Sequence, residues 1–82
     1  MTFMVQFTVK PGNKNKVVEL FEQRGPSRNP GVTFRGGWIA AHADVVFVLV
    51  DSAEESLVSN AAKSWSEVGD FHITEVIDFE KF

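Results

Sequence analysis

No set of side chains in this chain stands at a known catalytic spacing. Cysteine is absent, which excludes disulfides, thiolate nucleophiles and thiolate metal ligands. There is no Gly-x-Ser-x-Gly motif, and the adjacent glycines Gly36 and Gly37 fall inside an expected strand, so they do not form a phosphate-binding loop before a helix. The candidates considered below are the two histidines with Asp44, the two tryptophans and the three arginines.

His42 and His72, together with Asp44, are the only set that resembles a metal site of two histidines and one carboxylate. In the strand order expected below, another strand separates the two strands that carry them, so at about 4.8 Å per strand the histidines start about 10 Å apart. One subunit does not easily close that gap around an ion. We therefore predict no metal and no cofactor, and we interpret His42 as a polar residue at the tip of a hairpin.

Trp38 and Trp65 are the residues best suited to hold a flat apolar molecule. The glycine pair before Trp38 removes side chains beside the indole, and glycine inside a strand often marks a bulge or a close approach to the backbone. Strand alternation places Trp38 on the face opposite Arg35, unless a bulge at the glycine pair reverses it. The alternative is that both tryptophans only fill the core. The functional interpretation is an apolar pocket lined by Phe7, Trp38, Phe47 and Trp65, with His72 as a further candidate.

The three arginines, Arg24, Arg28 and Arg35, fall within 12 residues. Clustered guanidinium groups bind carboxylates and phosphates in a forked geometry, so these residues are candidates for an anion site. The alternative is that they form surface ion pairs with acidic residues expected at the same end of the domain, namely Asp51, Glu54 and Glu55.

Composition narrows the function classes. The net charge of -3 argues against a nucleic-acid binder, whose affinity depends on many phosphate contacts. The start of the chain alternates, has no basic leader and contains no apolar run long enough for a membrane span, so we expect no signal peptide and no membrane partner. Together with the absence of cysteine, this favours a cytoplasmic protein. The length leaves room for one domain, residues 1–82.

Periodicity and turn chemistry mark the elements that position these residues. Residues 2–9 alternate and predict a strand with one buried face. A turn leads into a helix that ends near Arg24, where Gly25 and Pro26 stop it, and a loop over residues 27–31 follows. Residues 32–41 and 45–51 then predict an antiparallel hairpin. Its second strand is apolar on both sides, so both of its faces should be covered.

The second half of the chain predicts a helix and a last strand. Ser52 and Glu55 have the spacing of a capping box, in which the Ser52 hydroxyl bonds the Glu55 amide and the Glu55 carboxylate reaches back. The helix that follows carries an apolar stripe and ends near Gly69. Residues 71–79 predict the fourth strand. One face of that strand should carry Phe71, Ile73, Ile77 and Phe79.

The order strand, helix, strand, strand, helix, strand is that of an α+β ferredoxin-like β-α-β-β-α-β sandwich. Its four-stranded antiparallel sheet has the order fourth, first, third, second, and both helices lie on one face. The other face remains uncovered and carries Met4, Val76 and alternate residues of the third strand. Such a patch is larger than a soluble monomer usually exposes, so we predict a homodimer formed through the sheet face.

A set of spaced residues along nearly the whole chain also carries a family resemblance. The set consists of Phe3-Met4-Val5, Gly12, Phe21, Arg24-Gly25, Pro30-Gly31-Val32, Trp38, Trp65 and Val68-Gly69-Asp70-Phe71. In these residues the chain resembles the dimeric α/β barrel superfamily, and most closely a small bacterial family of unknown function within it. The resemblance implies a ferredoxin-like fold that dimerises. Relatives include cofactor-free monooxygenases of aromatic substrates, haem-degrading monooxygenases and muconolactone isomerases, but no catalytic residue of theirs carries over to this chain.

We therefore expect a homodimeric domain that binds a small apolar or aromatic ligand. One alternative is a cofactor-free monooxygenase or isomerase acting on a small aromatic molecule, with His42 or His72 as the general base. Another is a structural or regulatory interaction module without a cavity. An enzyme needs a cavity of about 300 Å³ or more with a titratable group pointing into it, whereas a structural module needs none.

Overall fold

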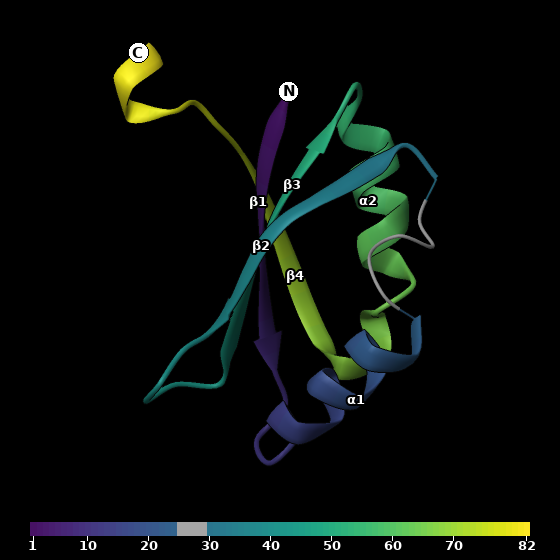
Figure 1. The fold of residues 1–82 in the computed structure, drawn as a ribbon. Coiled ribbons are helices and arrows are strands. Elements are labelled where there is room, and N and C mark those ends of the chain that lie inside the picture. Colours follow the sequence, from purple (N-terminus) through teal and green to yellow (C-terminus); the bar gives the residue numbers. More distant parts are fainter. Residues whose placement is uncertain (25–29) are drawn as a thin grey trace.

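The computed structural model describes residues 1–24 and 30–82, and for Arg24 the backbone alone. A four-stranded antiparallel sheet is covered on one side by two helices (Figure 1), which is consistent with the predicted ferredoxin-like arrangement. The strand order β2-β3-β1-β4 is the predicted one. The elements are β1 (Thr2–Val9), α1 (Lys14–Arg24), β2 (Val32–Ile39), β3 (Val45–Ser52), α2 (Glu55–Lys63) and β4 (Gly69–Val76), with short 3-10 turns η2 (Ser66–Val68) and η3 (Phe79–Lys81).

The core lies between the sheet and the helices. β1 alternates as predicted, because Phe3, Val5, Phe7 and Val9 point to the helices while Thr2, Met4, Gln6 and Thr8 point away. The predicted helix stop at Gly25 and Pro26, and most of the predicted loop, fall outside the described residues. The buried residues are Phe3, Val5, Phe7 and Val9 of β1, Val46 and Val50 of β3, Val17 and Leu20 of α1, Val58 and Ala62 of α2, and Trp65 and Val68 after it.

We call the sheet face opposite the helices the outer face. On β1 and β3 it carries Met4, Phe47 and Leu49, which are only half-buried in the single chain. In the part of the chain that the structure describes, no helix is long and apolar enough to cross a membrane.

The predicted capping box at the start of α2 is wrong. Ser52 is the last residue of β3: it pairs with Val32, and its amide donates to the Met1 carbonyl at 2.9 Å. Held in the sheet, Ser52 bonds Glu54 instead of Glu55: its hydroxyl donates to the Glu54 carbonyl at 3.1 Å and accepts from the Glu54 amide at 3.4 Å. The helix begins at Glu55, after an extended Glu54 whose side chain makes no capping bond. Strand pairing therefore takes precedence over the local helix signal.

The predicted fourth strand extends too far. β4 ends at Val76, which pairs with Thr2, the first residue of β1. No residue of β1 remains to pair with the chain beyond this point, so the strand stops. The Asp78 carboxylate then accepts a hydrogen bond from the Glu80 amide at 2.8 Å and closes the turn η3. Residues 77–82 leave the sheet, and we call them the C-terminal arm.

The hairpin between β2 and β3 is close to prediction, but β2 ends at Ile39 instead of residue 41. The Ala40 amide donates to the Val45 carbonyl at 2.9 Å and closes the connection, so residues 40–44 form the tip. A register shift between Phe34 and Gly36 leaves Arg35 without a partner in the ladder. This is a β-bulge, and it decides where Trp38 lies.

Candidate functional site

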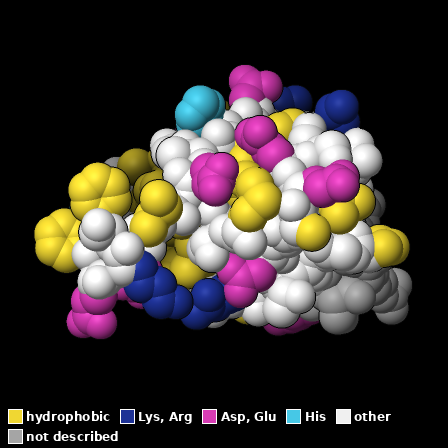
Figure 2. Space-filling view, turned by 90° about the horizontal axis from the view of Figure 1, so that it is seen from above, with side chains coloured by type: hydrophobic (Ala, Val, Ile, Leu, Met, Phe, Trp, Pro, Cys, Tyr) yellow, Lys and Arg dark blue, Asp and Glu magenta, His cyan; other side chains and the backbone are white. Residues whose placement is uncertain are grey.

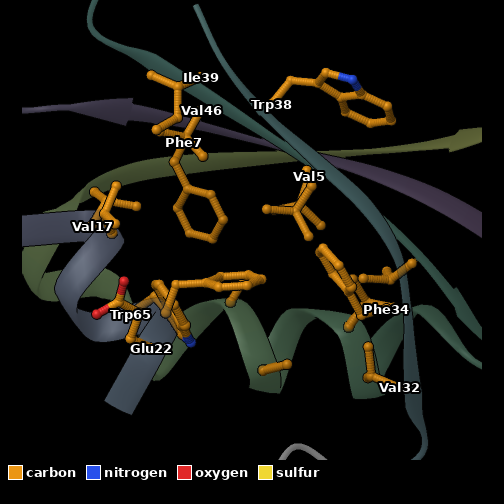
Figure 3. Close-up of a pocket in the computed structure, with 18 residues that line it drawn as sticks. Val5, Phe7, Val17, Glu22, Val32, Phe34, Trp38, Ile39, Val46 and Trp65 are labelled. Atoms are coloured by element: carbon orange, nitrogen blue, oxygen red, sulfur yellow. The ribbon is translucent and has the colours of Figure 1, made fainter. Parts of the chain in front are cut away.

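A cavity of about 330 Å³ lies between the helix side of the sheet and the two helices (Figure 3). Its floor is formed by helix-facing residues of the sheet, and its far wall by α1, α2 and Trp65. Nearly all of these side chains are apolar, so the cavity suits an apolar molecule. The lining includes Val5 and Phe7 of β1, Val46, Val48 and Val50 of β3, Val32, Phe34 and Ile39 of β2, Val17, Val18 and Phe21 of α1, and Val58, Ala61 and Ala62 of α2.

Aromatic rings form one side of the cavity. The Trp65 ring centroid lies 6.3 Å from that of Phe7 and 6.1 Å from that of Phe21. Phe21 in turn meets Phe34 of β2 edge to face, with centroids 5.2 Å apart. Tilted and edge-to-face pairs at these distances are favourable aromatic contacts, and they leave ring faces and edges available to a flat ligand.

Glu22 of α1 is the one charged side chain among the described residues that line the cavity. Its carboxylate lies on the α1 side in Figure 3. The sequence interpretation did not include Glu22, because a single exposed glutamate on a helix carries no distinguishing pattern.

Phe7 and Trp65, both predicted to line a pocket, lie together in the cavity. Phe34 was missed, although the alternation of Val32 and Phe34 before the bulge would have placed it on the helix side.

Trp38 borders this cavity but faces mainly the other way. Its backbone pairs with Phe47, an outer-face residue, and the side chain is 54% exposed. Figure 3 shows the indole at the rim, directed away from Phe7 and Trp65. Plain strand alternation, which would put Trp38 and Arg35 on opposite faces, does not hold here, and the alternative of a reversing bulge does: the extra residue, Arg35, brings both side chains to the outer face.

The Trp38 indole packs against the backbone of Gly36. A Cβ added at Gly36 would lie 2.9 Å from the Cη2 atom of that ring, so the indole rests directly on the glycine backbone. Gly37 has a different surrounding: its added Cβ would meet the Phe34 ring at 3.5 Å, an ordinary contact. Gly36 therefore contacts the tryptophan on the outer face, and Gly37 lies on the cavity side.

Phe47 and His72 do not line the cavity, which corrects their placement in the predicted pocket. Both pair with Gln6 of β1, which points away from the helices. Because opposite residues of paired strands share a face, Phe47 and His72 lie on the outer face on either side of Gln6. The sequence left the register of β3 open, since that strand is apolar throughout and shows no alternation.

His42 is exposed in the tip that joins β2 and β3. Of the residues that the structure describes, no group of three or more histidines and carboxylates is placed to hold a metal ion. The set of His42, Asp44 and His72 is therefore not brought together as a ligand group.

Arg35 pairs with Asp51, at 3.2 Å between Nη1 and Oδ2. The Thr2 hydroxyl donates to the other carboxylate oxygen at 2.7 Å. The Thr2 hydrogen bond, and to a lesser degree the Arg35 guanidinium, lower the pKa of the Asp51 carboxyl. The Arg35 side chain therefore forms the surface ion pair that was the alternative to an anion site. Arg28 and the Arg24 side chain lie outside the described residues, so the predicted cluster is not assembled from what the structure describes.

Fold and cavity together define a small α+β domain with a ferredoxin-like arrangement and an apolar cavity between its layers. The chain belongs to a family described as "Domain of unknown function (DUF3303)", whose family model matches residues 1–82. Comparison with curated proteins and with solved structures found no match.

Proposed function

We propose that the protein is a homodimer in which each subunit binds a small apolar or aromatic molecule in the cavity between sheet and helices. The observation that carries this proposal is the cavity itself. Its volume of about 330 Å³ lies at the lower end of the range of small-molecule sites, and its walls are apolar side chains that include the Trp65 ring in contact with the rings of Phe7 and Phe21. Because the walls are apolar and partly open to solvent, an apolar occupant would remove them from water, which favours its binding.

The total surface of the chain supports the homodimer. The folded chain exposes 5555 Å², whereas a monomer of 9.1 kDa typically exposes about 4,900 Å². The excess of about 650 Å² is surface that a partner can cover, and the exposed C-terminal arm contributes to it. The outer face offers the apolar residues for such an interface, among them Met4, Trp38, Phe47 and Leu49. Two sheets packed face to face would give the dimeric α/β barrel arrangement that the sequence resembles.

The position of the histidines disfavours the oxygenase or isomerase alternative in the form that uses His42 or His72 as the general base, and leaves Glu22 as the titratable side chain that such an enzyme would have in its cavity. A general base must lie within hydrogen-bond reach of its substrate. His42 lies in the hairpin tip and His72 on the outer face, and neither lines the cavity. A purely structural module is also less favoured, because it has no need of the cavity.

Fluorescence titration tests ligand binding directly. In Trp38→Phe protein, Trp65 is the one remaining tryptophan and lies in the cavity wall. Naphthalene and 2-naphthol are suitable probes, and we expect saturable quenching with one site per chain. Ala61→Phe places a ring in the cavity and should abolish the titration, whereas Ala43→Phe, an exposed alanine in the hairpin tip, should leave it unchanged.

Quenching that does not saturate, or that is equal in the two alanine variants, would refute the cavity as a binding site. Native mass spectrometry of the protein from its own cells would report the number of subunits and any retained small molecule in one measurement.

A further inference from the structure

The C-terminal arm carries the most exposed apolar residues of the described chain. Ile77 is 64% exposed, Phe79 96% and Phe82 98%. Single exposed apolar side chains are ordinary on protein surfaces. Two phenylalanines and an isoleucine within six residues, with both rings almost entirely in water, are a concentrated apolar surface of the kind that marks an interaction site.

The arm has a defined local structure that presents its rings together. The Asp78 carboxylate accepts from the Glu80 amide at 2.8 Å, and the Asp78 carbonyl accepts from the Lys81 amide at 2.9 Å. Positions three apart in a 3-10 turn lie on the same side, so η3 directs Phe79 and Phe82 to one side of the arm. The rings thus form one apolar edge.

The arm stands on the same side of the sheet as the uncovered outer face. Figure 1 shows it opposite the side that α1 and α2 cover. Lys81 of the arm lines an open hollow at the end of the sheet, together with the outer-face residues Thr2, Thr33, Arg35 and Asp51 and with residues of the β2 and β3 ends such as Val32 and Ser52. In Figure 2, which looks down on this end of the molecule, apolar side chains protrude at the edge where the arm lies. A partner that packs on the outer face would therefore also contact the arm.

We infer that the arm crosses to the second copy of the chain and packs the Phe79 and Phe82 rings against it, which extends the dimer interface beyond the two sheets. This inference rests on the homodimer proposed above. Two arguments favour a second copy as the occupant: the chain exposes more surface than a monomer of its mass, and the arm is continuous with the face through which the dimer is proposed to form. In a two-fold dimer the contact forms twice, so four rings leave water together.

Sedimentation velocity over a range of concentrations tests the inference with three purified chains of residues 1–82: wild type, the double variant Phe79→Ser/Phe82→Ser, and Glu80→Ser as a control within the same arm. We expect the double variant to raise the dimer dissociation constant about 100-fold or more, because four rings lose their burial. Glu80→Ser should stay close to wild type. Both rings are exposed in the single chain, so all three chains should show the same circular dichroism.

Each outcome bears on the inference. If the double variant dimerises as tightly as wild type, the arm does not take part and the inference is overturned. If it dimerises more tightly, the arm covers its own sheet, which also overturns the inference. Wild-type protein that is monomeric at high micromolar concentration would refute the proposed homodimer itself, and with it the arm's partner.

Discussion

The two adjacent glycines of β2 should respond differently to the same substitution. Alanine can adopt the backbone conformation at both positions, since neither Gly36 nor Gly37 has a positive φ. At such positions the change from glycine to alanine stabilises a protein by about 0.4 to 1 kcal/mol, because the unfolded chain loses freedom. At Gly37 the new Cβ meets the Phe34 ring at 3.5 Å and fits, so the full gain is expected.

At Gly36 the same gain is offset by the displaced indole. The new Cβ would lie 2.9 Å from the Trp38 ring, so the ring must move. A little under half of this side chain is buried, since 54% of it is exposed. That burial amounts to roughly 100 Å² and about 2.5 kcal/mol at most. Displacing the ring sacrifices only part of this burial, which we put at about 1 kcal/mol. Gly36→Ala should therefore be less stable than Gly37→Ala by about 1 kcal/mol.

Urea unfolding of the two variants measures this difference, at one protein concentration because association adds to the apparent stability. A double-mutant cycle then assigns the cause. In the Trp38→Ser background the difference between the two alanine variants should vanish, which gives a coupling free energy of about 1 kcal/mol between residues 36 and 38. Equal stability of Gly36→Ala and Gly37→Ala, or a difference that survives without the tryptophan, would refute the placement of the indole on Gly36.

Two further predictions concern stability. A Cβ at Gly69 would collide with the carbonyl oxygen of Thr8, which is backbone of the adjacent strand and has nowhere to move. Gly69→Ala should therefore lower the free energy of unfolding by about 3 kcal/mol or more, and a loss below about 1 kcal/mol in urea unfolding would contradict the close approach. The second prediction concerns Asp51, whose pKa is lower in the folded chain than its ordinary value of 3.8. A lowered folded pKa stabilises the protein above the unfolded pKa, and this contribution is lost as the pH falls through the folded value. Thr2→Val removes the main cause and should reduce the acid-induced loss of stability below about pH 4, and identical pH profiles would argue against the Thr2 bond.

The elements and their order were predictable because each depends on local periodicity and on general rules of strand connection. β1 alternates cleanly, and the split arrangement of two crossovers leaves few strand orders. The errors fall where pairing between distant segments decides. Ser52 carries the helix-capping signal but is held in β3 by its partners Val32 and Met1. β4 stops at Val76 because β1 begins at Thr2, and the sequence of residues 71–79 contains no signal that predicts this strand end.

The candidate site was predictable only in part for the same reason. Phe7 and Trp65 come from elements with clear periodicity, and both line the cavity. Phe47 belongs to a strand without alternation, so its face follows from the register with β1, which the sequence alone does not specify. Trp38 depends on a single bulge, and its face reverses when one residue is added to the ladder.

That bulge also joins the two surfaces on which the proposed function depends. With Arg35 outside the ladder, Gly37 turns toward the cavity, where the lack of a side chain leaves space beside Phe34. The next residue, Trp38, turns its indole to the outer face while still bordering the cavity. A partner packed on the outer face would therefore press on a side chain that belongs to the cavity rim. Coupling between two binding sites acts in both directions. If a ligand displaces Trp38, it changes the affinity of the two chains for each other by some factor. Dimerisation must then change the affinity for the ligand by the same factor.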